Sequence, residues 1–276
     1  MNGLDPVLLR GLSAIESYLD QVVVAGGWVP HLYELLYDAS TSGRSPRTRD
    51  LDLAVPRSIP VRDNSIDRLL TSAGFRCEFT SATTPPVTKY ISTDRDQEVE
   101  IEFITDAPGE SEAVISVQPG LTAQELHYVS LLLSDPWTVD LGQMTGGAVC
   151  YSVLVPSPAA FVIQKALVFR RRRDRLKAEK DLYYIFFVLE SFPNWSPLIA
   201  ADLSAIASAR PAWFKRCQAD LKMLFGGSNS AGVDAILNQR PQTAFSGMSD
   251  EQFRHYVHSV ILGLVELMDS ALSDRA

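Results

Sequence analysis

The hydrophobic pattern of this chain changes at residue 156, and that change constrains the fold more than any other feature. Before it, short segments alternate polar and apolar residues or run in β-branched residues, as strands do. After it, Pro156-Ser157-Pro158 offers a helix cap followed by a first-turn proline, and most of the remaining residues have helical spacing. The sequence therefore predicts an α+β fold, with strands and helices in residues 1–155 and a helical domain in residues 156–276.

Composition excludes several classes of protein. The 276 residues include 33 acidic and 25 Lys and Arg side chains, for a formal net charge of −8, and 46% are hydrophobic, enough for a sizeable core. Disordered and fibrous classes are therefore excluded. No stretch reaches the roughly 18 uncharged apolar residues of a membrane span, and residues 1–20 lack the pattern of a signal peptide. We expect a cytoplasmic chain that makes no membrane contact.

The cysteines do not indicate a disulfide framework or a zinc site. Cys77, Cys150 and Cys217 are widely separated and form no Cys-x-x-Cys pair. All three are expected to be buried thiols.

A strand, a glycine turn and a helix follow one another near the start of the chain. The sequence predicts a helix over residues 5–19, a buried strand over 22–24 and a helix over 29–36, with Gly26 and Gly27 between the last two. Two glycines after a strand let the backbone turn tightly and bring its N–H groups close to a ligand. This turn is therefore a candidate phosphate-binding loop.

Residues 48–55 alternate polar and apolar side chains, which predicts a strand with Asp50 and Asp52 on one face. Two carboxylates at i and i+2 repel each other unless water or a cation lies between them. Mg²⁺ is commonly held by one or two carboxylates together with substrate phosphates. The pair is a candidate metal site, although such a pair on its own is more often a surface feature.

A second alternation covers residues 98–104 and places Glu98, Glu100 and Glu102 on one face of a predicted strand. This strand can supply a third carboxylate to a metal site that begins with the aspartates. A helix over residues 65–73 and further strands are also expected, the strands over residues 75–80, 89–92, 113–117, 137–141 and 149–155.

These parts in this order resemble the nucleotidyltransferase superfamily with the DNA polymerase β-like fold, and more narrowly the bacterial AbiEii-like nucleotidyltransferases, many of which are toxins of toxin–antitoxin systems. The similar segments are Val24-Ala25-Gly26-Gly27, Arg47-Thr48-Arg49-Asp50-Leu51-Asp52-Leu53, Ile101-Glu102-Phe103-Ile104-Thr105, Gln164-Lys165-Ala166-Leu167 and Lys180-Asp181-Leu182-Tyr183-Tyr184. Together they span roughly residues 20–190. The resemblance implies a mixed β-sheet flanked by helices and followed by a helical C-terminal domain.

The resemblance also implies an activity and a set of site residues. It implies transfer of a nucleoside monophosphate from a nucleoside triphosphate to an acceptor hydroxyl with two Mg²⁺ ions, or Mn²⁺ in their place. The metal ligands and catalytic residues would be Asp50, Asp52 and Glu102, with Glu100 as the alternative third acid. The nucleotide-binding residues would be Gly26, Gly27, Thr48, Lys165 and Lys180.

The acceptor and the partner stay open at this level. The AbiEii-like resemblance favours an RNA or tRNA end, or a protein, as acceptor, and an antitoxin protein as partner. The arginines at positions 170–173 can contact an RNA backbone or an acidic antitoxin, or can simply be a solvated turn or helix surface. Alternatives are an inactive protein of this fold that binds a nucleotide, RNA or protein, a nucleotidyltransferase for small molecules of the antibiotic type, and an accidental motif match.

Overall fold

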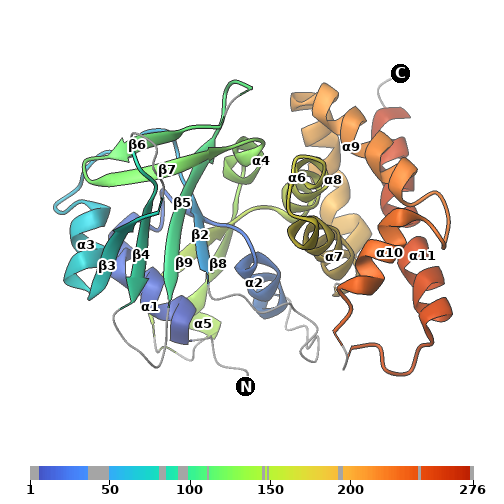
Figure 1. Ribbon diagram of the computed structural model, residues 1–276, viewed down its shortest axis with the longest axis horizontal. Helices are drawn as coiled ribbons and strands as arrows, with labels where there is room; N and C mark the ends of the chain where they lie inside the picture. Colours follow the sequence, from blue (N-terminus) through green and yellow to red (C-terminus); the bar gives the residue numbers. More distant parts are fainter. Residues whose placement is uncertain are drawn as a thin grey trace. The chain divides into compact units, whose positions relative to one another are not determined.

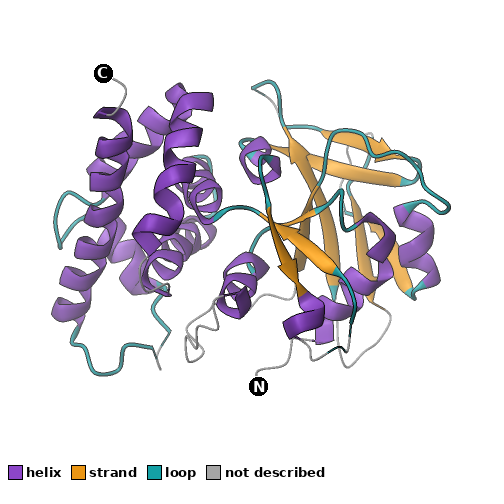
Figure 2. Cartoon of the chain, turned by 180° about the vertical axis from the view of Figure 1, so that it is seen from behind, coloured by secondary structure: helices purple, strands orange, loops and turns teal. Residues whose placement is uncertain are grey.

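The computed structural model describes residues 6–36, 50–80, 85–92, 99–110, 112–144, 147, 149–191, 195–241 and 244–273. The chain forms two compact units, the first ending at Pro156 and the second continuing from Ser157. Among the described residues, strands occur only in the first unit, and the second unit from Ser157 onwards is helical (Figures 1 and 2). The architecture is thus an α+β fold with a mixed sheet, flanking helices and a helical C-terminal region, as expected.

The first unit is built on one sheet. Its strands among the described residues are β1 (Val23–Val24), β2 (Asp50–Ala54), β3 (Phe75–Phe79), β4 (Thr88–Ser92), β5 (Glu100–Asp106), β6 (Val114–Gln118), β7 (Leu121–Leu126), β8 (Trp137–Asp140) and β9 (Ser152–Val155). They run in the order β3-β4-β5-β2-β1-β9-β8, and β7 joins β5 and carries β6. The β2–β5, β1–β9 and β5–β7 pairs are parallel and the other pairs antiparallel, so the sheet is mixed.

The helices of this unit are α1 (Pro6–Ala14), η1 (Glu16–Tyr18), α2 (Trp28–Leu36), α3 (Ile66–Ser72), α4 (Val129–Leu133) and α5 (Leu141–Met144). Helix α1 packs on one face of the central strands. A Cβ on its Gly11 would lie 2.7 Å from Leu51 of β2 and 3.3 Å from Ile101 of β5, and both of these side chains are fully buried. The close fit explains why a glycine stands there, and it assigns the apolar residues of both strands to the face under α1.

The opposite face of the same strands divides into two parts. At the carboxyl ends, Ala54 and Ile104 join a buried cluster with Val129 and Leu132 of α4. At the amino ends the same face carries acidic side chains, which are partly or fully exposed: Asp50 and Asp52 of β2, and Glu100 and Glu102 of β5. The apolar end anchors the strands, while the acidic end is left open to solvent.

The second unit contains six helices within its described residues, namely α6 (Pro158–Phe169), α7 (Arg175–Ser191), α8 (Trp195–Ala209), α9 (Pro211–Leu224), α10 (Ala231–Asn238) and α11 (Asp250–Ser273). Ser157 caps α6, because its hydroxyl accepts a hydrogen bond from the Ala160 N–H at 3.3 Å, and Pro158 occupies the first turn. The predicted cap is confirmed. Aromatic side chains form part of the core of this unit, since Tyr183, Phe186 and Phe187 of α7 are buried and Phe186 contacts Phe253 of α11 edge-on at 5.5 Å.

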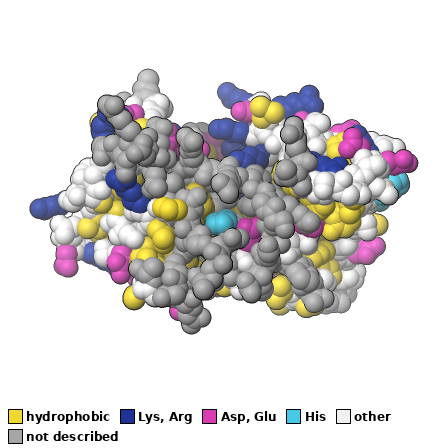
Figure 3. Space-filling view, turned by 90° about the horizontal axis from the view of Figure 1, so that it is seen from below, with side chains coloured by type: hydrophobic (Ala, Val, Ile, Leu, Met, Phe, Trp, Pro, Cys, Tyr) yellow, Lys and Arg dark blue, Asp and Glu magenta, His cyan; other side chains and the backbone are white. Residues whose placement is uncertain are grey.

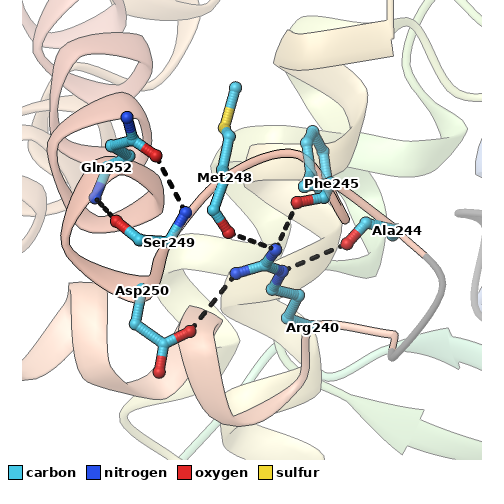
Figure 4. Close-up of polar contacts among 7 residues, drawn as sticks. All are labelled: Arg240, Ala244, Phe245, Met248, Ser249, Asp250 and Gln252. Carbon is cyan, nitrogen blue, oxygen red and sulfur yellow. Dashed lines mark hydrogen bonds and ion pairs between the residues drawn. The ribbon is translucent and has the colours of Figure 1, made fainter.

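One arginine ties together the connection between α10 and α11 (Figure 4). The Arg240 guanidinium donates to the carbonyl oxygens of Ala244, Phe245 and Met248 and pairs with Asp250, which begins α11. It also lies over the Phe253 ring at 4.7 Å. Because Phe245 adopts a left-handed φ of 58°, this turn needs such support from outside its own backbone.

Helix α11 is long and apolar enough, by length and composition, to cross a membrane, and it is the one such helix in the described part of the chain. A core helix of a globular unit meets the same criteria. One side of α11 is buried within the helical unit, through Phe253, Val257, Ile261, Leu264, Val265, Met268 and Ala271. That packing is typical of an amphipathic core helix.

The structure differs from expectation in several places. The helix expected over residues 5–19 breaks into α1 and the short 3₁₀ turn η1. Strand β7 was not predicted, because five of its six residues are buried or half-buried and the alternation is lost. The prediction of three buried thiols was wrong for two. Only Cys217 is buried, whereas Cys150 is exposed in the connection before β9 and Cys77 is partly exposed on the edge strand β3.

Candidate active site

Strand β2 presents its two aspartates on one face, as its alternation predicts. Leu51 and Leu53 are fully buried, while Asp50 is exposed and Asp52 half-buried. The burial of the leucines fixes the direction of the aspartates, because a one-residue slip would put carboxylates into the core.

Strand β5 brings its glutamates to the same face. It pairs with β2 in parallel, with Asp50 opposite Glu100 and Asp52 opposite Glu102. Residues directly opposite one another in a sheet have their side chains on the same side, about 5 Å apart at Cβ. Four carboxylates from two neighbouring strands therefore gather at the open end of the sheet, an arrangement that is costly without a compensating cation. Glu98, the third acid of the predicted strand, lies outside the described residues.

Lys89 on β4 supplies one such cation. It stands opposite Glu102 in the antiparallel β4–β5 pair, and its Nζ lies 2.6 Å from Glu100 Oε2 and 2.7 Å from Glu102 Oε1. Partial burial opposes the charge on its ammonium group, but the hydrogen bonds and charges of the two glutamates outweigh it, so the pKa of Lys89 lies above its usual value. Sequence reasoning did not select Lys89. Its only local signal was a polar residue at the start of the strand expected over residues 89–92.

The glycine turn lies against the Asp52 carboxylate. The Ala25 N–H donates to the Asp52 carbonyl oxygen at 2.8 Å, which places the turn beside β2. Gly26 has a φ of +64°, and a Cβ built on it would lie only 1.9 Å from Asp52 Oδ2. Only glycine fits there, on both backbone and contact grounds. The structure thus brings Gly26 together with Asp52, and Gly27 completes the turn into α2.

Helix α2 begins directly after this turn. Its first residue, Trp28, is 6% exposed and packs in the core. Its indole N–H is buried without a hydrogen-bond partner among the described residues. His31 contacts the Trp28 ring edge-on at 5.8 Å and pairs with Glu34 at 3.2 Å, so its side chain has packing and ion-pair partners within α2. The amino end of α2 presents N–H groups and a partial positive charge next to Gly26.

The donor set fits a hard divalent cation by its chemistry, since Asp50, Asp52 and Glu102 offer only carboxylate oxygens. The tight fit of Gly26 against Asp52 holds one of these carboxylates in place. No group of three acidic, histidine or cysteine side chains among the described residues is arranged to hold a metal ion between them. Glu102 is instead turned to Lys89.

The remaining residues singled out in the sequence lie elsewhere. Thr48 falls outside the described residues. Lys165 and Lys180 belong to the second unit, on α6 and α7. The Lys165 ammonium is buried and pairs with Asp181 at 2.9 Å, an arrangement that links the two helices, and the Lys180 ammonium lies 5.5 Å from the centre of the Tyr184 ring.

The arginine run forms the connection between α6 and α7 rather than a helix face. Two of its arginines make ion pairs within their own unit, Arg170 with Asp220 and Arg172 with Asp181, and Arg175 at the start of α7 pairs with Glu179. Figure 3 shows a face of the molecule on which positive side chains lie among negative ones. The ion pairs of Arg170 and Arg172 favour the interpretation of the run as a surface turn tied to the helical unit.

The chain was also compared with known proteins. Residues 7–206, well over half of the 276 residues, match the family described as nucleotidyltransferase. No curated protein matches the chain. The matched segment includes the glycine turn, the β2 aspartates, the β5 glutamates and the first helices of the second unit. By its sequence, and with a fold consistent with the family, the chain belongs to this family of nucleotidyltransferases.

Proposed function

We propose that this protein is a Mg²⁺-dependent nucleotidyltransferase whose active site is the acidic end of the β2–β5 pair. The observation that carries the proposal is the register of that pair, which sets Asp50 and Asp52 beside Glu100 and Glu102, together with the contact of Asp52 with Gly26. A protein that only bound a partner would have no need to confine four carboxylates beside a glycine turn.

In this proposal Asp50 and Asp52 hold two Mg²⁺ ions, or Mn²⁺ in their place, and Glu102 is the third carboxylate. The ions would lower the pKa of the attacking hydroxyl and stabilise the charge on the leaving pyrophosphate. Gly26 and Gly27 offer backbone N–H groups to the phosphates, and the amino end of α2 adds its partial positive charge. Thr48, Lys165 and Lys180 are proposed as further nucleotide contacts.

The reaction requires no covalent intermediate on the protein. The acceptor hydroxyl releases its proton to solvent, its oxygen bonds to the α-phosphorus as the bond from that phosphorus to the bridging oxygen breaks, and pyrophosphate leaves. The work of the protein is to hold the attacking oxygen in line with the leaving pyrophosphate and to stabilise the charge on the transferred group, which is the main source of rate in such transfers.

The acceptor and the biological role are also proposals. The resemblance of residues 24–27, 47–53 and 101–105 to AbiEii-like proteins supports an RNA or tRNA end, or a protein, as acceptor, and an antitoxin as partner. The arginines at positions 170–173 would contact the RNA backbone or an acidic antitoxin with their remaining donor groups. A cytoplasmic location, where nucleoside triphosphates and RNA are abundant, belongs to the same proposal.

The test is transfer of label from each of the four α-³²P nucleoside triphosphates, with Mg²⁺, to total RNA and to total protein. Wild type is compared with Asp50→Asn/Asp52→Asn and with Asp63→Asn, which removes an exposed carboxylate of the same unit as a matched control. Label is expected with wild type and the control and not with the double variant. Equal labelling by all three proteins would contradict the proposal.

A second candidate function has one observation in its favour. Because Lys89 engages Glu102, the third carboxylate is neutralised within the protein, as it would be in a non-catalytic domain that binds a nucleotide. That candidate predicts a thermal shift with nucleoside triphosphate, the same with EDTA as with Mg²⁺, and no label transfer to any acceptor. In an active enzyme, both the thermal shift with nucleoside triphosphate and the label transfer would require the metal.

A further inference from the structure

The acidic end of the sheet contains a cation of its own. Three strands line up there, with Lys89 of β4 opposite Glu102 of β5, and Glu102 opposite Asp52 of β2. Glu102 thus has the ammonium group of Lys89 on one side and a carboxylate on the other. A metal ion held by Asp52 and Glu102 would have to share Glu102 with Lys89, or displace it.

The ion pairs of Lys89 are not those of a freely exposed surface lysine. The side chains of Lys89, Glu100 and Glu102 are 20%, 27% and 30% exposed, and the ammonium group bridges both glutamates at 2.6 and 2.7 Å. Glu78 of β3 is opposite Lys89 on the other side, but it pairs with Arg76. Partly buried pairs of this kind are screened less by solvent and salt than exposed pairs.

The two glutamates are not equivalent. Glu102 is in register with Asp52, whose carboxylate is held against Gly26, whereas Glu100 is in register with Asp50, which is exposed at the start of β2. A lysine has several rotatable bonds, so its ammonium group can leave one glutamate and keep the other. Glu100 is therefore suited to retain Lys89 while Glu102 turns to a metal.

We propose that Lys89 is a built-in competitor of the divalent cation, which holds Glu102 until metal binds and then remains on Glu100. The inference rests on the proposed function, because it assigns Glu102 to the metal. Its consequence is a site that binds metal weakly on its own, with Lys89 setting how weakly. Lys89 is in this respect a positioning residue that acts through Glu102.

The experiment measures the affinity for Mn²⁺ without nucleotide, from the electron paramagnetic resonance signal of the free ion. Lys89→Gln is expected to bind Mn²⁺ roughly three- to tenfold more tightly than wild type, since a competing ion pair of this type is worth about one factor of ten at most. Lys89→Arg keeps the positive charge and is expected to remain weak. Arg68→Gln removes an exposed positive charge from α3 of the same unit and serves as the matched control, with unchanged affinity.

Substitutions of the two glutamates distinguish competition for Glu102 from a general effect of the positive charge of Lys89. Glu100→Gln leaves Lys89 with Glu102 alone and is expected to weaken Mn²⁺ binding, and Glu102→Gln is expected to weaken it by removing a ligand. In Lys89→Gln/Glu102→Gln the gain from losing the lysine should disappear. Thermal melting of each variant checks that the sheet is folded, and Lys89→Met provides a second uncharged variant if Lys89→Gln does not fold.

The outcomes distinguish this inference from the proposed function. If wild type binds Mn²⁺ and Asp50→Asn/Asp52→Asn does not, but the uncharged Lys89 variants bind no more tightly than Arg68→Gln, the inference is wrong and the metal site stands. The inference would also be wrong if Lys89→Gln raised the Mn²⁺ affinity equally with and without Glu102, because the effect would then come from the lost positive charge and not from competition for Glu102. If neither wild type nor any Lys89 variant binds Mn²⁺, both the inference and the proposed metal dependence fail.

Discussion

The carboxylate of Asp52 occupies the space that a side chain on Gly26 would need, since a Cβ on Gly26 would lie 1.9 Å from Asp52 Oδ2. The glycine turn after β1 and the aspartate on β2 are thus one structural unit. The backbone conformation of the turn requires a glycine at position 26, and this contact places that glycine against Asp52, the residue proposed for metal binding.

Gly26→Ala is therefore expected to disable the proposed site. The substitution forces Asp52 aside, and it places an L-residue in a left-handed conformation at a cost of about 1–2 kcal/mol. A displacement of about 1 Å in the site can reduce the rate of transfer about a hundredfold. The measurement is the rate of label transfer together with the affinity for Mn²⁺.

The control for that variant is Gly109→Ala, because a Cβ at Gly109 meets nothing within 4 Å. It should leave both the rate and the affinity unchanged. If Gly26→Ala folded and kept the wild-type affinity for Mn²⁺, the assignment of Asp52 to the metal would be contradicted.

A second prediction concerns the buried pair between Lys165 and Asp181, which are only 7% and 4% exposed. Asp181→Ala leaves the ammonium group of Lys165 buried without its main partner and also removes the ion pair to Arg172. The expected cost is about 3–5 kcal/mol of unfolding free energy, and Lys165→Met/Asp181→Leu should recover most of it. Urea unfolding followed by circular dichroism measures both.

Lys177→Met, at an exposed position on α7, is the control for the lysine change. A Lys165→Met variant with wild-type stability but weakened nucleoside triphosphate binding would favour the nucleotide-binding role of Lys165 over a role in helix packing.

The third prediction is a pH dependence of stability at Glu179. Burial opposes its charge, but hydrogen bonds from Arg175, Gln239 and Asn238 outweigh burial and lower its pKa below the usual value. A carboxyl whose pKa is lower in the folded state contributes stability above its unfolded pKa, which is about 4.3. That contribution is lost as the pH falls through the folded pKa.

Glu179→Gln should therefore lower the melting temperature at pH 7, at a cost of about 1–3 kcal/mol, and the difference from wild type should shrink between pH 5 and pH 3. Thermal melts at stepped pH values measure it. Glu266→Gln, at an exposed position on α11, should show no such dependence. A difference that grew on acidification would mean that the pKa of Glu179 is raised instead.

The fourth prediction concerns Arg240, whose guanidinium serves three carbonyl oxygens in the turn before α11. Arg240→Lys keeps the charge but cannot make these hydrogen bonds together, so a loss of about 1–3 kcal/mol is expected. Hydrogen exchange should accelerate in the turn around Phe245 and at the start of α11. Arg216→Lys on α9 is the matched substitution, and an equal effect of the two would show that the turn does not depend on the arginine.

The sequence alone was sufficient to predict the features that depend on short-range periodicity. The alternation of residues 48–55 and 98–104 predicted both strands and, within each strand, the common face of its carboxylates, because one register buries the apolar residues and any slip exposes them. Ser157 and Pro158 likewise marked the start of α6, since capping is a local interaction. The change of pattern at residue 156 predicted the helical C-terminal region.

Only the tertiary structure decided which elements are neighbours. Lys89 is on β4, the strand before β5 in the chain. Nothing in the spacing of Lys89 from Glu100 and Glu102 indicates that the two strands pair with Lys89 opposite Glu102. Asp52 meets Gly26 for the same reason, because β1, which ends beside Gly26, pairs with β2, which contains Asp52, although the two strands lie far apart in the sequence. The pairing and register of the central strands follow from burial of their apolar residues against α1 and α4, a property of the assembled unit rather than of any segment.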